Sequence, residues 1–338
     1  MAMLFITSTH IGDAVLSTGL LAHLLSRHPE QRVTIACGAP AAKVFAATPR
    51  LDAIHVLRKQ RHHRHWAELW RKTRGTRWDV LVDLRRSIMP WLLRAGQKRV
   101  LPKPRGTMHR VELIASTLGL PPQDPVVWTG PEHEERARGL IDGKGETILA
   151  LAPGATWAGK VWPADRFAEL ARRLSAPGGP LPDARVLLVG SQDERAPARA
   201  LVEGLPGGQA IDAFGLDVLS TYAALRRCRL MVGNDSAMMH LAAASGIPTV
   251  GLFGPTRDEH YAPWGPAAMV VRTPQSVEEL TGHPDYDTRT TGSLMTGLEV
   301  ARVEAAILKR WPRLGRSAAA AGSLMPPSSR RRPSGCGR

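Results

Sequence analysis

One stretch of the chain, residues 232–256, combines the start of a helix with side chains that could hold a phosphate. It reads VGNDSAMMHLAAASGIPTVGLFGPT, which predicts a strand end, a capped helix, a second strand and a loop. A helix that opens at the carboxyl end of a strand offers free backbone N–H groups and the positive end of its dipole to an anion. A capped helix without any ligand would read in the same way. The candidate ligands in this stretch are Asn234, Asp235, Ser236, Ala237, Met239 and His240.

A second stretch near the N-terminus, THIGDAVLSTG, has the same layout. Gly12 and Asp13 stand where a predicted strand has ended and a helix begins. A glycine at such a point lets another group approach the backbone closely. Asp13 suits a helix N-cap, and it equally suits a general base that faces a cleft. The stretch lacks the G-x-G-x-x-G pattern, which counts against a nicotinamide dehydrogenase.

A third stretch, APGATWAGKVWP, follows a predicted strand in the second half of the chain. Gly154, Ala155 and Thr156 offer small side chains and accessible N–H groups, and Lys160 offers a positive charge. Small residues with one lysine suit a phosphate, although the Walker pattern is absent and Lys160 could equally be a surface lysine.

Alternating strands and helices surround these three stretches. The alternation predicts an α/β fold with two doubly wound parallel sheets, each covered by helices on both faces. The expected strands are 4–7, 32–37, 53–57, 78–83, 148–152, 185–189, 230–232 and 249–253. The expected helices are 14–26, 66–72, 111–118, 164–174, 195–203, 219–226, 237–245 and 300–311.

A chain of 338 residues exceeds one ordinary hydrophobic core, so two domains are expected. We place an N-terminal domain at 1–135, a linker at 136–147, a C-terminal domain at 148–312 and a disordered basic tail at 313–338. The final helix of the C-terminal domain could pack back on the N-terminal domain.

The net charge of +15 is concentrated in two places. Residues 58–110 hold 16 Lys and Arg against three acids, and residues 313–338 hold six Arg and no acid. Such a distribution indicates an anionic partner, which could be nucleic acid, an anionic membrane surface or an acidic substrate, or else a solvated basic surface. No apolar run reaches the ~18 residues that span a bilayer, and the N-terminus is a poor signal peptide. Three scattered cysteines suit a reducing cytoplasm.

The three stretches, in this order and spacing, resemble glycosyltransferase family 9, the ADP-heptose:lipopolysaccharide heptosyltransferases. The resemblance covers residues 3–312. It implies a GT-B fold, in which two Rossmann-like domains face a cleft. It also implies an ADP-sugar donor held mainly by the C-terminal domain, an acceptor held by the N-terminal domain, and inverting transfer without a metal or other cofactor.

Several residues take roles through the resemblance. Asp13 matches the proposed catalytic base, and Lys160 matches the cationic group near the donor phosphates. Asp235, Ser236 and His240 match the diphosphate-binding motif. The candidates for the donor are Gly12, Gly154, Ala155, Thr156, Lys160, Asn234, Asp235, Ser236, Ala237, Met239 and His240, with Asp193 or Glu194 near the ribose. The acceptor-side candidates are Arg85, Arg86, His109 and Arg110.

One position departs from the family pattern. The usual glycine of D-[ST]-G is Ala237 here, and its side chain could shift or weaken the phosphate contact.

The expected partners are ADP-heptose, an anionic lipid A–Kdo acceptor and the inner face of the cytoplasmic membrane, which the protein would touch peripherally from the cytoplasm. Three alternatives remain open: a transferase for another nucleotide sugar, a non-catalytic transferase-like protein, and a nucleic-acid-binding protein. Against the last, no recognisable nucleic-acid-binding module appears, so no nucleic acid is expected as a partner.

Overall fold

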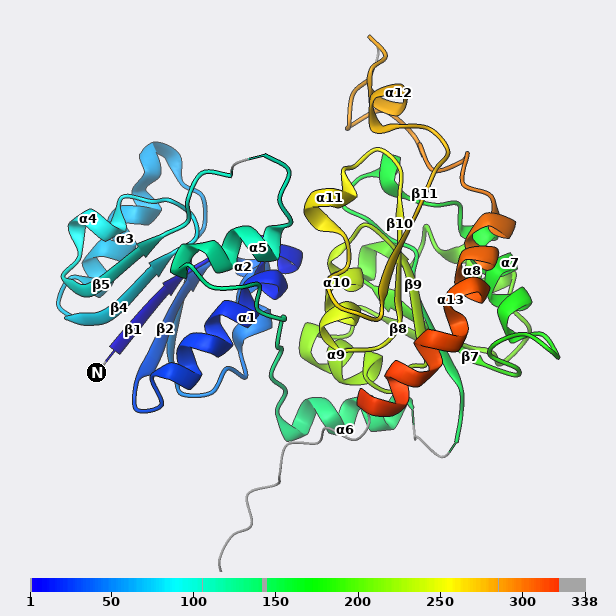
Figure 1. Ribbon diagram of the computed structural model, residues 1–338, viewed down its shortest axis with the longest axis horizontal. Helices are drawn as coiled ribbons and strands as arrows, with labels where there is room; N and C mark the ends of the chain where they lie inside the picture. Colours follow the sequence, from blue (N-terminus) through cyan, green and yellow to red (C-terminus); the bar gives the residue numbers. More distant parts are fainter. Residues whose placement is uncertain (1, 105, 142–144, 285, 322–338) are drawn as a thin grey trace, which may run out of the picture.

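Two parallel sheets, one in each half of the molecule, organise the fold (Figure 1). The computed structural model describes residues 2–104, 106–141, 145–284 and 286–321. The first sheet has the order β3-β2-β1-β4-β5, and all of its neighbouring strands run parallel. Its strands are β1 (Ala2–Ile6), β2 (Arg32–Cys37), β3 (Leu51–Val56), β4 (Trp78–Asp83) and β5 (Ala95–Val100). The three central strands are almost wholly buried, as apolar runs in a parallel sheet should be.

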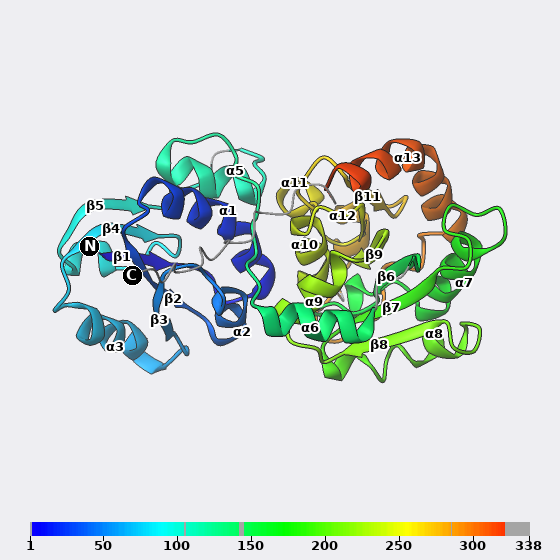
Figure 2. The same cartoon turned by 90° about the horizontal axis from the view of Figure 1, so that it is seen from below.

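Helices cover both faces of this first sheet (Figure 2). The longest, α1 (Ile11–Arg27), is rich in Ala and Leu and buries residues from Ala14 to Leu25. The other helices are α2 (Ala39–Ala42), α3 (Arg64–Thr73), α4 (Met89–Leu92) and α5 (Arg110–Ala115), with short 3₁₀ turns at η1 (Lys43–Phe45), η2 (Arg61–His63) and η3 (Ser116–Leu118).

The second sheet has the order β11-β10-β9-β6-β7-β8, again with parallel neighbours. Its strands are β6 (Ile148–Ala152), β7 (Arg185–Gly190), β8 (Ala210–Phe214), β9 (Leu230–Asn234), β10 (Thr249–Phe253) and β11 (Ala268–Arg272). Its helices are α7 (Ala164–Ser175), α8 (Arg199–Glu203), α9 (Val218–Leu225), α10 (Ala237–Ala244), α11 (Asp258–Tyr261), α12 (Val277–Thr281) and α13 (Val300–Ala321), with 3₁₀ turns η4 (Ala158–Lys160) and η5 (Gln192–Glu194).

The strand orders explain where a ligand site should form. In the first sheet the chain winds outward in both directions from the neighbouring strands β1 and β4, and in the second sheet from β6 and β9. Ligands of doubly wound sheets bind outside the carboxyl ends of the strands at such a switch point. The loops after β1, β6 and β9 are the three stretches that the sequence singles out. The helices α1 and α10 contact each other where the two halves meet (Figure 1).

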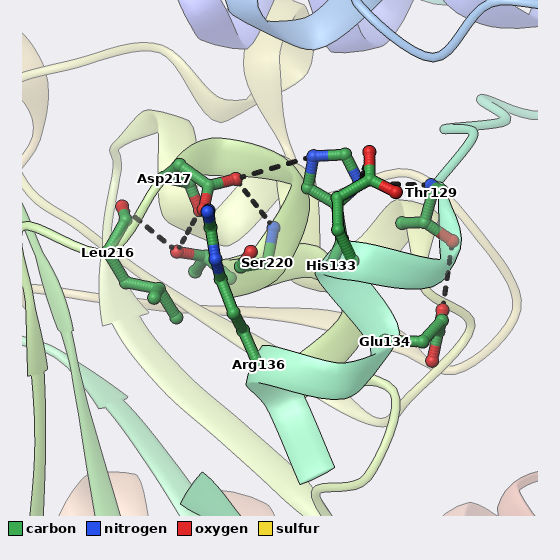
Figure 3. A network of polar contacts seen from close by, with 10 residues as sticks. Thr129, His133, Glu134, Arg136, Leu216, Asp217 and Ser220 are labelled. Atoms are coloured by element: carbon green, nitrogen blue, oxygen red, sulfur yellow. Dashed lines mark hydrogen bonds and ion pairs between the residues drawn. The ribbon is translucent and has the colours of Figure 1, made fainter. Parts of the chain in front are cut away.

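The connection between the halves differs from the predicted linker. A helix, α6 (Pro131–Leu140), occupies part of 136–147 and packs against α9 of the second half. Arg136 Nη1 donates to Asp217 Oδ2 at 2.9 Å, and the His133 ring lies beside the same carboxylate (Figure 3). Upstream, the N–H of Val126 donates to Thr18 of α1. The chain therefore crosses between the halves after Val126 and before α6, because α6 is fastened to the second half by charged side chains.

The end of the chain also differs from expectation. In α13 the side chains of Val303 and Ile307 are buried in the core of the second half with those of α7, so residues 300–311, the part of this helix whose side chains the structure describes, pack on the second half rather than back on the first. The helix continues to Ala321, into the segment for which disorder is predicted, where a run of alanines favours helix. The remainder of that segment, 322–338, lies outside the described residues.

Asp217 should contribute to stability in a pH-dependent way. Burial raises the pKa of this carboxyl, but its contacts with Ser220 and Arg136 outweigh burial and lower the pKa below its ordinary value. A group with a lowered folded-state pKa stabilises the protein above its unfolded-state pKa and stops doing so as pH falls through the folded-state value. Asp217→Ala, which also removes the N-cap of α9, should lower the free energy of unfolding by about 1–2 kcal/mol at pH 7.

Denaturant unfolding from pH 7 to pH 3 would measure this effect. Asp217→Asn keeps a capping oxygen and removes the charge. The difference between its free energy of unfolding and that of the native protein should therefore shrink as pH falls. Asp52→Asn, which breaks an exposed pair with Arg32, is the control and should change little. A constant difference between Asp217→Asn and the native protein at all pH values would contradict the assignment.

Candidate active site

A cavity of about 530 Å³ lies between the two halves, where the carboxyl ends of both sheets meet. The first half contributes four residues at the start of α1, His10, Ile11, Gly12 and Asp13, together with Pro40 of α2. The second half contributes the loops after β6, β9 and β10: Thr156, Lys160, Asp235, Ser236, Ala237, His240, Thr256, Arg257, His260 and Tyr261. The structure thus brings Asp13, Lys160 and the start of α10 together, although they are remote in sequence.

Two helix N-termini open on this cavity. His10 is the N-cap of α1 and Ser236 is the N-cap of α10, and neither side chain caps its own helix. The first-turn N–H groups of both helices and their dipoles therefore favour an anion in the cavity. Gly12 allows this arrangement, because a β-carbon on Gly12 would lie 3.0 Å from Cδ2 of His240.

Lys160 is held in place on the cavity wall by a buried network. Its Nζ donates to Asp235 Oδ2 at 2.6 Å, and the Thr256 hydroxyl donates to the same oxygen at 2.8 Å. The Lys160 and Asp235 side chains are only 16% and 9% exposed. The network joins loops from three neighbouring strands, so the position of the ammonium group is fixed before any ligand binds.

Asp13 lies opposite, in the first turn of α1. Its Oδ1 is 3.3 Å from Nε of Arg110, an ion pair whose geometry falls short of a hydrogen bond. Among the described residues no donor forms a hydrogen bond with Oδ1, which is buried beside the Arg110 guanidinium. Asp13 lines the cavity, and a carboxylate there can accept a proton. Tyr261 reaches towards Asp13 from the second half. Burial, together with the negative charges of Asp13 and Asp235, raises the pKa of Tyr261, although Arg110 opposes the shift.

Two buried polar atoms on the α10 side of the cavity lack partners in the described part of the chain. They are Oγ of Ser236 and Nδ1 of His240. Burial lowers the pKa of His240 to about 4, against the opposing effect of Asp235 and Asp13, so the imidazole is neutral at pH 7. A neutral imidazole and a hydroxyl can each donate or accept, and buried polar atoms normally find a partner. A ligand bound at the start of α10 would supply one.

Two predicted donor ligands in the same stretch do not face the cavity. Asn234 is fully buried, its amide donates to the carbonyl of Pro153 at 2.7 Å, and its Oδ1 accepts the N–H of Trp162 at 3.1 Å. Both ends of this side chain therefore fasten the loop after β6 to β9. Met239 is fully buried in the hydrophobic core. Asn234 and Met239 therefore pack beneath the residues that line the cavity.

The other donor candidates lie beside the cavity. Gly154 and Ala155 do not line it, whereas Thr156 does. Gly154 makes room for Glu194, since a β-carbon at Gly154 would overlap the Glu194 carboxyl group. Glu194 also accepts the N–H of Ser191 at 2.8 Å, and its neighbour Asp193 is exposed.

The acceptor-side candidates separate into three groups. Arg110 lies beside Asp13. Arg85 and Arg86 follow β4, away from the cavity lining, with the Arg85 guanidinium 5.2 Å from the ring centre of Trp66. His109 instead joins the two halves: its Nε2 lies 3.0 Å from the carbonyl oxygen of Ala262, and its ring packs on Trp264. Burial lowers the pKa of His109, and its ring is committed to this contact, which corrects its placement among the acceptor ligands.

Sequence reasoning missed several cavity residues. Thr256, Arg257, His260 and Tyr261 all follow β10, which neighbours β9 in the sheet. The Gly-Pro-Thr loop after the predicted strand 249–253 could have indicated them. A loop at the carboxyl end of that strand must lie beside the start of α10, which follows the neighbouring strand. His10 precedes the predicted helix and gave no comparable signal.

Two Rossmann-like halves with a cavity between their facing strand ends define a GT-B glycosyltransferase fold, which confirms the predicted fold class. The sequence profile of glycosyltransferase family 9 (heptosyltransferase) matches residues 94–282, just over half of the chain. The chain therefore belongs to glycosyltransferase family 9 and is a glycosyltransferase, as the resemblance implied.

Relatives and solved structures agree with this membership. Lipopolysaccharide heptosyltransferase 2 of Salmonella typhimurium is 24% identical over 319 residues, covering 80% of this chain and 88% of its own length. A family 9 glycosyl transferase from Veillonella parvula superposes with a TM-score of 0.74 at 20% identity, over 92% of this chain and 97% of that one. The E. coli ADP-heptose lps heptosyltransferase II superposes with a TM-score of 0.72 at 19% identity, over 93% of this chain and 99% of that one.

Proposed function

We propose that this glycosyltransferase moves a heptose from ADP-heptose to the inner core of lipopolysaccharide, with lipid A–Kdo as the acceptor. The observation that carries the proposal is the convergence of Asp13, Lys160 and the Ser236 helix start on one cavity. The E. coli structure of similar fold bears the description of an ADP-heptose heptosyltransferase, and we extend that donor to this chain.

The reaction we propose is a single displacement with inversion. An acceptor hydroxyl attacks the anomeric carbon of the heptose while the bond from that carbon to the diphosphate oxygen breaks. Asp13 takes the hydroxyl proton, and ADP leaves with the bonding electrons. The departing diphosphate gains negative charge, which the Lys160 ammonium and the N–H groups of α1 and α10 stabilise more strongly than in the ground state. The charge is balanced by these groups, so we propose that no metal ion is needed.

The rest of both substrates fits around this centre. We place the donor diphosphate against Ser236, Ala237 and His240 at the start of α10, where Oγ of Ser236 and Nδ1 of His240 have no hydrogen-bond partner among the described residues. We place the nucleoside towards the loops after β6 and β7, where the Glu194 or Asp193 carboxylate would meet the ribose. Arg110, Arg85 and Arg86 remain our candidates for the anionic acceptor, because Arg110 begins α5 beside Asp13 and the other two follow β4 of the first half.

The setting we propose is the inner face of the cytoplasmic membrane, where the protein acts as a peripheral cytoplasmic enzyme. The strong positive charge of residues 58–110 supports this placement, since basic residues are attracted to anionic membrane surfaces. No helix of the described residues has both the length and the apolar character to cross a bilayer.

Donor binding followed by transfer would test the function. We expect calorimetry to detect ADP-heptose binding that exceeds the binding of UDP-glucose or GDP-mannose. Truncated lipopolysaccharide without heptose should then gain one heptose of inverted anomeric configuration, at equal rate with and without EDTA. Preference for another nucleotide sugar would overturn the proposed donor, and loss of activity in EDTA would overturn metal independence. No binding of any nucleotide sugar would overturn the proposal as a whole.

A further inference from the structure

An apolar face lies on the first half, away from the cavity. It is formed by Trp66 and Trp70 of α3 and by Ile88, Trp91 and Leu92 around α4, and we call it the α3/α4 face. Trp91 is 73% exposed, Ile88 54% and Leu92 48%. A groove of about 600 Å³ with a strongly apolar lining runs between the two helices. Exposed apolar patches of this kind mark interaction sites, because single-chain proteins seldom expose several large apolar side chains together.

One part of the α3/α4 face packs on the core, and the other part is exposed. Leu69 and Met89, from the same two helices, are buried against Trp78 in a separate cluster under the sheet. Trp66 and Trp70 pack against this cluster and are partly buried, whereas Ile88, Trp91 and Leu92 are exposed. Figure 1 places both helices at the end of the first half that is remote from the second half, so the second half does not cover them.

Cations surround the apolar side chains. The guanidinium groups of Arg74 and Arg85 lie over the rings of Trp70 and Trp66, at 4.9 and 5.2 Å from the ring centres. Further exposed arginines on or beside the two helices are Arg64, Arg71, Arg86 and Arg94.

The acids within residues 58–94 do not offset these cations. Glu68 pairs with Lys72 at 2.8 Å, Asp79 accepts the N–H of Ala2, and Asp83 is fully buried and accepts from Ser87. The face therefore presents aromatic and aliphatic groups inside a rim dominated by arginines, in which the partly exposed acid Glu68 is neutralised by Lys72.

We infer that the α3/α4 face docks on an anionic lipid bilayer, with Trp91, Ile88 and Leu92 entering the interfacial layer and the surrounding arginines binding headgroup phosphates. Tryptophan favours the membrane interface, and an amphipathic helix with a basic polar face lies in the plane of that interface. Charge complementarity favours an anionic lipid surface over another copy of this chain, whose matching face would carry the same positive charge.

The placement of the face suits the reaction. Strand β4, which ends just before Arg85, pairs with β1, which ends just before the loop that leads to Asp13. The α4 end of the docked face and Asp13 both follow carboxyl ends of neighbouring strands, so we expect a lipid-linked acceptor to extend from the bilayer along these strand ends to the cavity. The inference deepens the membrane contact proposed above by naming the surface responsible.

Vesicle flotation with the full chain would test the inference. The native protein should float with vesicles of phosphatidylcholine and phosphatidylglycerol and much less with phosphatidylcholine alone. Trp91→Ala combined with Leu92→Gln should weaken binding by about tenfold or more. Arg64→Gln and Arg71→Gln should each weaken binding by about fivefold, from ~1 kcal/mol for each basic residue near an anionic surface.

Matched controls are available on the second half. Leu308→Gln changes an aliphatic side chain that is 47% exposed, and Arg302→Gln removes an exposed charge from the same helix; both should float as the native protein does. Brominated acyl chains should quench part of the native tryptophan fluorescence, and that part should fall in Trp91→Ala. Equal flotation of the face variants and the controls would overturn the inference, as would flotation of none of them.

Two further measurements separate the possible failures. Concentration-dependent dimers that Trp91→Ala abolishes, without vesicle binding, would assign the face to self-association and overturn the inference. Transfer to a deacylated, water-soluble acceptor should be unchanged in the face variants. Absence of that transfer in the native protein, with vesicle binding intact, would overturn the proposed function and leave the docking surface standing.

Discussion

Asp13→Asn should lower kcat by about 10²- to 10⁴-fold, the usual contribution of a positioned general base. Asparagine keeps the shape of the side chain and its place in the first turn of α1, but its amide cannot take the proton of an acceptor hydroxyl. The Kd for ADP-heptose should change little, because the diphosphate contacts that we propose are backbone N–H groups, Lys160 and side chains of α10, and not the Asp13 carboxylate. Single-turnover transfer and donor calorimetry on the same preparation would measure both quantities.

The expected pattern distinguishes a base from a structural carboxylate. Asp13 is paired with Arg110, so Asp13→Asn also frees that arginine. Arg110→Gln removes the same ion pair and leaves the carboxylate in place. If Asp13 acts only through the pair, the two variants should lose kcat equally; if it is the base, Asp13→Asn should lose far more. Asp52→Asn, in an exposed pair elsewhere on the first half, should retain full activity. An unchanged kcat in Asp13→Asn would reject the assignment.

The central strands of both sheets were predictable because their residues are apolar and buried on both faces. The strands β5, β8 and β11 were not predicted, and all three lie at sheet edges. β5, with the sequence AGQKRV, is exposed along most of its length, so it shows no apolar run to detect. Its place depends on backbone pairing with β4, and pairing between distant segments leaves no local signal.

The site was predictable where it follows from strand order, and was not where it depends on side-chain orientation. Asp13, Lys160 and Ser236 meet because each follows a central strand, which the sequence reveals. Asn234 lies two residues before Ser236 and looks like a ligand, yet its side chain points into the protein and joins β9 to the loop after β6. His109 likewise looks like a free polar residue, and only the packed halves show that it binds Ala262. A shift of one residue, from Asn234 to Asp235, changes a side chain that is buried behind the cavity into one that lines it.

Lys160→Met should weaken ADP-heptose binding and lower kcat/KM by about 10²- to 10³-fold, the typical loss when one preorganised group that stabilises a developing anion is removed. Methionine preserves most of the apolar stem, so the change isolates the charge. The loss should exceed that for Lys72→Met, which breaks an exposed lysine–carboxylate pair of 2.8 Å on α3 and touches no part of the cavity. Donor calorimetry and initial rates at several donor concentrations would separate binding from turnover.

A double variant decides how Lys160 acts. Removing the lysine also leaves Asp235 Oδ2 with Thr256 as its remaining hydrogen-bond partner in the described part of the chain, and that negative charge would itself repel a diphosphate. If Lys160 serves only to neutralise Asp235, then Lys160→Met combined with Asp235→Asn should recover donor binding. If the ammonium group stabilises the departing diphosphate directly, the double variant should remain as slow as Lys160→Met. We expect the second result, because Lys160 lines the cavity beside the start of α10, where the charge of the leaving group would develop.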